Sequence, residues 1–252
     1  MTAAPANDHS QAPPSAQHRC DVTTPVTPVV VFVPGLGLNS RSWQAVRDTL
    51  KEGTVVVLLP SMGQPAPRGT DLRVERQAER LLQDLPSGQP VILVGHSASC
   101  PVVVDVATRS RDVAGLVLVG PVTDPAAHTW PRMLSQWIRT AVHETPAEAT
   151  VLAPQYRRTG PASMYRGMDA VRHFRTDLTL LPLQLPVEIV RGANDRIASQ
   201  AWSSRLGQAS EGRLTTVPGA AHMVPLTHPA AVVAAIQRVR ATSERQEPAA
   251  VA

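Results

Sequence analysis

Two hydrophobic patterns alternate along the chain from residue 25 to residue 242. Short runs rich in β-forming residues predict six strands, at residues 29–33, 54–59, 91–94, 114–119, 187–190 and 213–217, and the first of them is entirely apolar. Apolar residues at helical spacing predict helices between them, at residues 39–51, 71–85, 98–109, 199–208 and 229–240. Repeated strand–helix units with short connections indicate an α/β domain, with a mostly parallel sheet, helices on both faces and right-handed crossovers.

A long helical segment, about residues 124–181, interrupts this alternation after the fourth strand. It is too long for a loop inside a compact domain, so we interpret it as a small inserted helical cap. Five of the chain's eight aromatic residues lie in it: Trp130, Trp137, Tyr156, Tyr165 and Phe174. Some of them form the cap's own core, but a cap this short has little interior. The others are expected to face the gap between cap and sheet, which suits a hydrophobic small molecule.

The two ends of the chain differ from this central domain. Residues 1–24 and 243–252 show no hydrophobic period and are expected to be disordered tails. The N-terminal stretch has no positively charged start and no apolar core, so it is not a secretory signal. We therefore expect a cytoplasmic protein.

Composition narrows the function classes. No run of about 18 apolar residues occurs, so no membrane-spanning helix is predicted. The two cysteines, Cys20 and Cys100, are too few for a disulfide scaffold or a cysteine-based zinc site. The net charge is +4, and the basic residues are scattered among acids instead of forming a cluster. A nucleic-acid partner is therefore not expected.

The strongest chemical signal is Gly95-His96-Ser97-Ala98-Ser99, between the third strand and the helix after it. A serine on so tight a strand-to-helix turn holds its hydroxyl at the edge of the sheet, beside the positive end of a helix. Small residues two positions to either side let the two backbones approach each other. Ser97 is therefore the candidate nucleophile, and an ordinary helix N-cap serine is the competing interpretation.

A serine nucleophile needs a base, and the eight histidines supply one candidate. Two lie in the N-terminal tail and three in the cap. His96 is expected to point away from Ser97, because consecutive strand residues face opposite ways. His228 precedes a proline and starts the last helix. His222, in the small-residue loop after the last strand, remains as the candidate base.

Two aspartates are candidates for the acid that orients the base. Asp195 follows the fifth strand, and its order relative to Ser97 and His222 matches the Ser…Asp…His order of one known fold. Asp124 follows the fourth strand and is the alternative acid. Both also fit common structural roles, a turn aspartate and a helix cap.

Glycines after the first strand suggest where a carbonyl oxygen would bind. In Pro34-Gly35-Leu36-Gly37 the loop backbone can approach a bound carbonyl closely. The N–H groups of Leu36 and Ala98 would then converge on its oxygen, as in an oxyanion hole. The competing interpretation is a simple tight turn. Together, four such elements at the carboxyl ends of four strands favour a ligand site at that edge of the sheet.

Taken in order, these motifs resemble the α/β-hydrolase superfamily, and among its members the small bacterial serine hydrolases with a helical cap. The four motifs are Phe32-Val33-Pro34-Gly35-Leu36-Gly37, Gly95-His96-Ser97-Ala98-Ser99, Gly192-Ala193-Asn194-Asp195 and Gly219-Ala220-Ala221-His222. The resemblance covers about residues 27–240. It departs from the usual pattern at Pro34, where His is frequent, and at Ser99, where Gly is usual. The usual N-terminal antiparallel hairpin is not evident, so a sheet of about six strands is expected.

The residues and the resemblance together predict a serine hydrolase that needs no metal or cofactor. It would cleave an ester, thioester or lactone of a hydrophobic small molecule through an acyl-enzyme on Ser97. Acyl transfer, cyclisation or carbon–carbon bond hydrolysis with the same triad are alternatives, as is a member of the fold that only binds a ligand. Seven arginines against five acids in the cap also allow an anionic substrate group or a carrier protein. The expected substrate contacts are Trp130, Met133, Trp137, Tyr156, Tyr165 and Met223.

Overall fold

A computed structural model describes residues 27–246, and a six-stranded sheet forms its centre. In sheet order the strands are β2 (Thr54–Val56), β1 (Val29–Val33), β5 (Val91–His96), β6 (Val113–Val119), β7 (Val187–Gly192) and β8 (Arg213–Val217). Every neighbouring pair is parallel, and Phe32 of β1 is in register with Val56 and Val94. The predicted α/β class and its six strands are confirmed.

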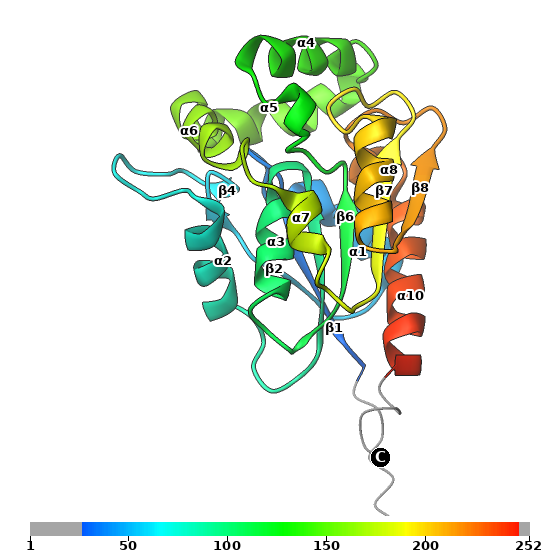
Figure 1. Cartoon of the computed structure of the whole chain (residues 1–252). Helices are drawn as coiled ribbons and strands as arrows, with labels where there is room; N and C mark the ends of the chain where they lie inside the picture. Colours follow the sequence, from blue (N-terminus) through cyan, green and yellow to red (C-terminus); the bar gives the residue numbers. More distant parts are fainter. Residues whose placement is uncertain (1–26, 247–252) are drawn as a thin grey trace, which may run out of the picture.

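Helices cover both faces of this sheet (Figure 1). One face carries α1 (Gln44–Leu50) and α10 (Pro229–Gln246). The other face carries α2 (Val74–Gln83), α3 (Cys100–Ala107) and α8 (Gln200–Ala209). In β1, β5 and β6 successive residues alternate between the two cores, which is why these strands read as nearly continuous apolar runs.

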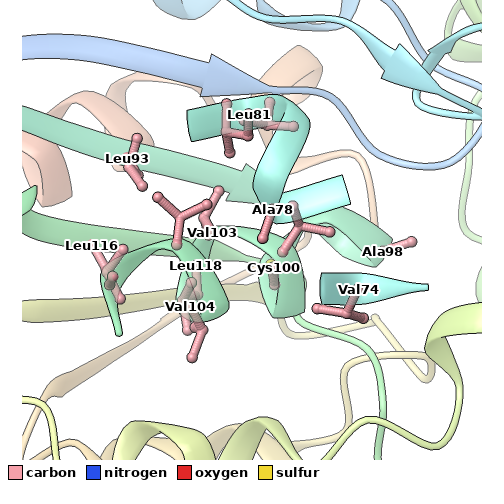
Figure 2. Close-up of a cluster of buried hydrophobic side chains, with 14 of the residues drawn as sticks. Val74, Ala78, Leu81, Leu93, Ala98, Cys100, Val103, Val104, Leu116 and Leu118 are labelled. Atoms are coloured by element: carbon pink, nitrogen blue, oxygen red, sulfur yellow. The ribbon is translucent and has the colours of Figure 1, made fainter. Parts of the chain in front are cut away.

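The core beneath α2 and α3 shows how β5, the strand that leads into Ser97, is held. Figure 2 shows Val74, Ala78 and Leu81 of α2 beside Val103 and Val104 of α3, all on the same side as Leu93 of β5. These side chains are at most 1% exposed, so the position of α3 relative to β5 is set by close apolar packing.

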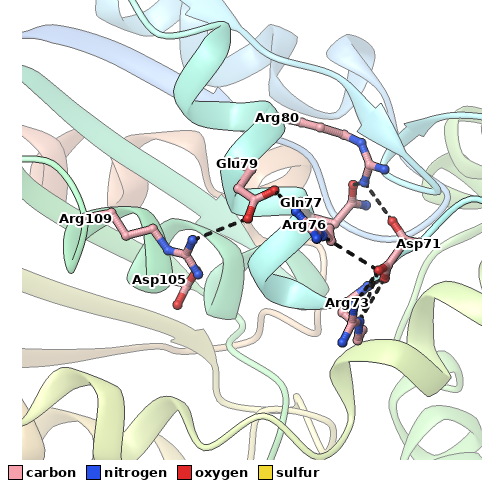
Figure 3. A network of polar contacts seen from close by, with 8 residues as sticks. All are labelled: Asp71, Arg73, Arg76, Gln77, Glu79, Arg80, Asp105 and Arg109. Carbon is pink, nitrogen blue, oxygen red and sulfur yellow. Dashed lines mark hydrogen bonds and ion pairs between the residues drawn. The ribbon is translucent and has the colours of Figure 1, made fainter.

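Charged residues join the outer surfaces of α2 and α3 (Figure 3). Arg109 forms ion pairs with Asp105 at 2.6 Å and with Glu79 of α2 at 3.8 Å. Arg73 pairs with Asp71 at 2.7 Å just before α2. Exposed pairs of this kind contribute about 0–1 kcal/mol each, so the apolar core dominates the α2–α3 contact.

Three helices inserted between β6 and β7 lie beyond the carboxyl ends of the strands (Figure 1). They are α4 (Trp130–Ala141), α5 (Pro146–Thr159) and α6 (Pro161–Val171), preceded by the short η3 (Pro125–Ala127). The next helix, α7 (Thr176–Leu180), packs against α3 and α8 instead. The cap therefore comprises residues 124–175. The last part of the segment predicted as cap, α7, belongs to the helical layer that covers the sheet.

Several element boundaries differ from the prediction. The first helix begins as a 3-10 turn, η1 (Ser40–Trp43), and the second strand ends at Val56. Beyond it, β3 (Leu59–Pro60) pairs with β4 (Gly63–Gln64) in a separate small sheet.

The C-terminal helix also differs from the prediction, because α10 continues to Gln246. The predicted tail is therefore wrong for residues 243–246. The sequence has no helix breaker before Pro248, and the buried side chain of Ser243 is 7% exposed. The predicted N-terminal tail, residues 1–24, lies outside the described residues. None of the helices within residues 27–246 has both the length and the apolar character of a bilayer span.

Candidate active site

Ser97 lies on a sharp turn between β5 and α3, as predicted. Its φ is +58°, a left-handed conformation that is uncommon outside glycine and is typical of a nucleophile elbow. The turn needs Gly95, because a Cβ there would lie 2.9 Å from Val103 Cγ2 and 3.1 Å from Cys100 Cα. Ser97 also begins η2 (Ser97–Ser99), so its hydroxyl stands at the positive end of the helical segment that leads into α3.

His222 and Asp195 are in direct contact. His222 lies in the loop between β8 and α9 (Val224–Thr227), and its Nδ1 is 2.7 Å from Asp195 Oδ2. The other carboxylate oxygen accepts hydrogen bonds from the N–H groups of Ile197 at 2.8 Å and Ala198 at 3.0 Å. Both oxygens of this fully buried acid are therefore satisfied, and the acid is held in one orientation.

Electrostatics support an ionised acid beside the histidine. Burial alone would raise the pKa of Asp195, but His222 and the hydrogen bonds from Ala198 and Ile197 outweigh it, so this pKa lies below its usual value. Burial alone would lower the pKa of His222, but the Asp195 carboxylate holds this pKa above its usual value. The pair therefore favours a carboxylate that stabilises an imidazolium, which a general base requires.

A buried arginine holds the loop that carries the acid. Arg191, at 3% exposure, donates to the backbone oxygens of Asp195 and Ala198, both at 2.8 Å, and to Gln200 Oε1 at 3.0 Å. Three donors in a fixed plane fix the shape of the loop from Asp195 to Gln200. No local sequence pattern points to Arg191.

Asp124, the alternative acid, is used differently. Its Oδ1 accepts a hydrogen bond from the Ala126 N–H at 2.9 Å and so caps η3, while its Oδ2 is 3.5 Å from Ser199 Oγ. It lines a pocket under the cap, but its carboxylate has neither a hydrogen bond nor an ion pair with His222 among the residues described. The structure thus brings Asp195, not Asp124, to the histidine.

The loop after β1 lies directly against the elbow. A Cβ on Gly35 would be 3.1 Å from Ser97 Cβ and 2.9 Å from His96 Nδ1, so only glycine permits this approach. Leu36 follows Gly35 and lines the same pocket as Ser97 and His222, and Ala98 follows Ser97 in η2. The two candidate oxyanion donors therefore belong to segments in contact with each other.

Ser97 and His222 open into a common pocket of about 590 Å³. No hydrogen bond joins the Ser97 hydroxyl to His222 within residues 27–246. Such a bond is often long in an unliganded hydrolase and tightens when substrate binds. A second pocket, of about 270 Å³, adjoins the first under the cap. Both pockets are lined by Leu36, Val122, Trp137, Met164, Met168 and Ile197.

Each side chain predicted to contact substrate lines one of these pockets. The second pocket is lined by Trp130, Met133, Trp137 and Tyr165, and the first by Trp137, Tyr156 and Met223. Trp130 stacks on Tyr165 with ring centroids 4.5 Å apart. Phe174, the fifth cap aromatic, packs against the main core instead.

Two further residues influence His222, and neither influence was predicted from the sequence. The His96 ring lies 4.9 Å from the His222 ring, centroid to centroid, and its Nε2 is 3.2 Å from the His222 carbonyl oxygen. Glu144, in the cap between α4 and α5, lies close enough for its negative charge to raise the pKa of His222. Burial first and Glu144 second also raise the pKa of Tyr156, to about 12. These effects on His222 come from residues far from it in the sequence, and no local pattern signals them.

Comparison with known families agrees with this geometry. Residues 30–235 match the model of the alpha/beta hydrolase family. The chain belongs to the alpha/beta hydrolase family. The match includes the elbow of this hydrolase and the loops that carry its candidate acid and base. Its sequence matches no curated protein.

Solved structures share the fold of this alpha/beta hydrolase at low sequence identity. MenH from S. aureus is 14% identical with a TM-score of 0.70, covering 88% of this chain and 96% of its own. A thermophilic esterase from Thermogutta terrifontis is 19% identical with a TM-score of 0.67, covering 87% and 92%. Est816, described as degrading N-acyl homoserine lactones, is 13% identical with a TM-score of 0.67, covering 84% and 92%. At these identities the similarity shows the fold alone.

Proposed function

We propose that this protein is a serine hydrolase that cleaves an ester, thioester or lactone of a hydrophobic small molecule through an acyl-enzyme on Ser97. The observation that carries the proposal is the 2.7 Å contact between His222 and the buried Asp195, with His222 and Ser97 in one pocket. A protein that only binds a ligand has no need of a strained serine, a histidine and a satisfied buried carboxylate in this order.

The reaction follows from these positions. Ser97 Oγ attacks the substrate's carbonyl carbon while His222 takes the hydroxyl proton, and the Asp195 carboxylate stabilises the imidazolium that forms. The N–H groups of Leu36 and Ala98 hold the developing oxyanion. His222 then gives its proton to the leaving group, which departs and leaves the acyl group on Ser97. A water molecule, deprotonated by His222, attacks this ester and releases the acid, and Ser97 regains its proton.

The substrate class rests on the two adjoining pockets. The reactive carbonyl lies in the pocket with Ser97, and an extended apolar part of the substrate continues beneath α4 toward Trp130 and Tyr165. Trp137 lines both pockets and is 53% exposed, so it stands where the two meet and gains contact when substrate is present. Structural neighbours that are named as esterases or as a lactone-degrading enzyme support a carbonyl ester substrate.

Hydrolysis of nitrophenyl esters of increasing acyl length tests this proposal. The wild-type protein is expected to prefer long over short chains, because the second pocket removes apolar surface from water only when the chain reaches it. Ser97→Ala should retain the fold and lose about 10³–10⁶ in kcat. Turnover of Ser97→Ala within about tenfold of the wild type would contradict the proposed nucleophile.

A further inference from the structure

Ser99 occupies a position where the elbow motif of similar hydrolases has glycine, and its side chain is fully buried. Its hydroxyl oxygen accepts a hydrogen bond from the His96 N–H at 2.8 Å. The same hydroxyl lies 2.8 Å from the carbonyl oxygen of Val33 and 3.0 Å from that of His96. A hydroxyl has one proton, and the shorter contact assigns it to Val33, the last residue of β1. Ser99 thus links the elbow to the strand from which the oxyanion loop starts.

His96 makes the corresponding link to the base. Its side chain leaves β5 on the face that carries Ile92 and Val94, and it is 1% exposed. Its Nε2 lies 3.2 Å from the His222 carbonyl oxygen, which can only accept, so Nε2 carries the proton. Trp43 packs edge-on against the His96 ring at 6.1 Å and completes its enclosure.

The charge state of His96 is consistent with this donor role. Burial, and next the nearby His222, lower the pKa of His96 to about 3, whereas the His222 carbonyl and the Asp195 carboxylate oppose this shift only weakly. These are the titratable groups that act on its ring. His96 is therefore neutral wherever the enzyme works, and a neutral imidazole with its proton on Nε2 leaves the base's own charge undisturbed.

We propose that Ser99 and His96 form a clamp, a buried pair of positioning residues that sets the spacing of the oxyanion loop, the nucleophile and the base. The inference rests on the proposed function. Its links run from the Val33 carbonyl through the Ser99 hydroxyl to the His96 backbone, and from the His96 ring to the His222 carbonyl. The sheet fixes the strands but not the loops beyond them. The clamp ties the turn after β5 to the end of β1, where the oxyanion loop starts, and ties the end of β5 to the loop after β8. The functional atoms of these segments must agree to within about 1 Å.

Substitutions of Ser99 and His96 should affect the kinetics differently if the pair positions the reacting groups than if it only fills the core. Loss of the clamp misplaces reacting groups, so the rate at which Ser97 reacts falls while KM stays nearly unchanged. His96→Phe keeps an aromatic ring but removes the donor, and Ser99→Ala removes the hydroxyl. Each is expected to slow phosphonylation of Ser97 by a fluorophosphonate, and to lower kcat, by about 10–100-fold. His96→Gln restores an amide donor on a flexible chain and should recover part of this loss.

Val239→Ala provides the matched control. Val239 is fully buried in α10 and packs against Gly115 near the start of β6, at the edge of the sheet opposite to Ser97. It should lower the unfolding midpoint as much as the clamp variants do, while the phosphonylation rate remains that of the wild type. If correctly folded His96→Phe and Ser99→Ala react within about twofold of the wild type, the clamp is refuted.

A second measurement needs neither folding of these variants nor catalysis. Nitrogen-15 NMR of histidine-labelled Ser97→Ala protein should show His96 as the neutral tautomer with its proton on Nε2, unchanged from about pH 5 to about pH 9. Titration of His96 in that range, or a proton on Nδ1, would overturn the clamp. Failure of the wild-type protein to react at Ser97 would instead contradict the proposed function, and the NMR result alone would then decide the geometry of the clamp.

Discussion

Replacing Asp195 by Asn changes the protonation of the base, because the structure dictates which way the new amide must face. Asp195 Oδ1 accepts from the N–H groups of Ile197 and Ala198, at 2.8 and 3.0 Å. An amide NH₂ placed there would oppose two donors, so the Asn oxygen takes that position and the NH₂ faces His222 Nδ1. Nδ1 must then accept, and the imidazole proton moves to Nε2, the atom that has to take the proton from Ser97.

The expected loss is large while the fold remains. A base held in the wrong tautomer lowers kcat by about 10⁴, equivalent to about 5.5 kcal/mol of transition-state stabilisation. Without the carboxylate, burial dominates and the pKa of His222 falls below its usual value. The assay is kcat and kcat/KM for a nitrophenyl ester from about pH 5 to about pH 9, with circular dichroism as the check on folding.

Asp124→Asn is the matched control. Asn is as good a helix cap as Asp, so the hydrogen bond from the Ala126 N–H is preserved and activity should stay at the wild-type level. Wild-type activity in Asp195→Asn would show that Asp195 does not orient His222. A large loss in Asp124→Asn with a small one in Asp195→Asn would place the acid in the loop after β6.

Two other substitutions test the cap. Trp137→Ala should change the free energy of unfolding by no more than about 0.5 kcal/mol, since the side chain is 53% exposed. It should lower kcat/KM about tenfold for long acyl chains alone, the effect of about 50 Å² of lost apolar contact. Phe174→Ala should lower the free energy of unfolding by about 2 kcal/mol and leave the chain-length preference unchanged, because Phe174 packs on the main core. Equal chain-length profiles in Trp137→Ala and Phe174→Ala would contradict these separate roles. Glu144→Gln removes a negative charge that raises the pKa of His222, so the rise of kcat/KM with pH should move to lower pH, and an unmoved profile would show that Glu144 does not act on the base.

Strands β1, β5 and β6 were predictable because each is buried on both faces and therefore reads as an almost uninterrupted apolar run. The end of the second strand was not, since the apolar run continues through Leu59 while the chain has already left the main sheet after Val56. The end of α10 was missed for the opposite reason. Its last turn is polar in sequence, and the burial of Ser243 depends on tertiary contacts.

The candidate site was predictable where function demands an unusual local sequence. The strand, small residues and helix around Ser97 point to an elbow without any tertiary information, and the loop positions of Asp195 and His222 follow from the order of the strands. The placement of His96 was only half right. It does leave β5 on the face away from Ser97, but the loop from β8 brings His222 to that same face, 126 positions along the chain. Arg191 and Glu144 were missed because their effects depend on how loops fold back over the sheet.

Covalent labelling is the measurement that decides whether Ser97 is a nucleophile activated by His222. Wild-type protein, Ser97→Ala and His222→Ala are each treated with a fluorophosphonate, and the modified residue is identified by intact mass and peptide mapping. We expect one adduct per wild-type chain, on Ser97, none in Ser97→Ala, and labelling slower by about 10³-fold or more in His222→Ala. An adduct on another residue, or labelling of His222→Ala at the wild-type rate, would contradict these roles of Ser97 and His222.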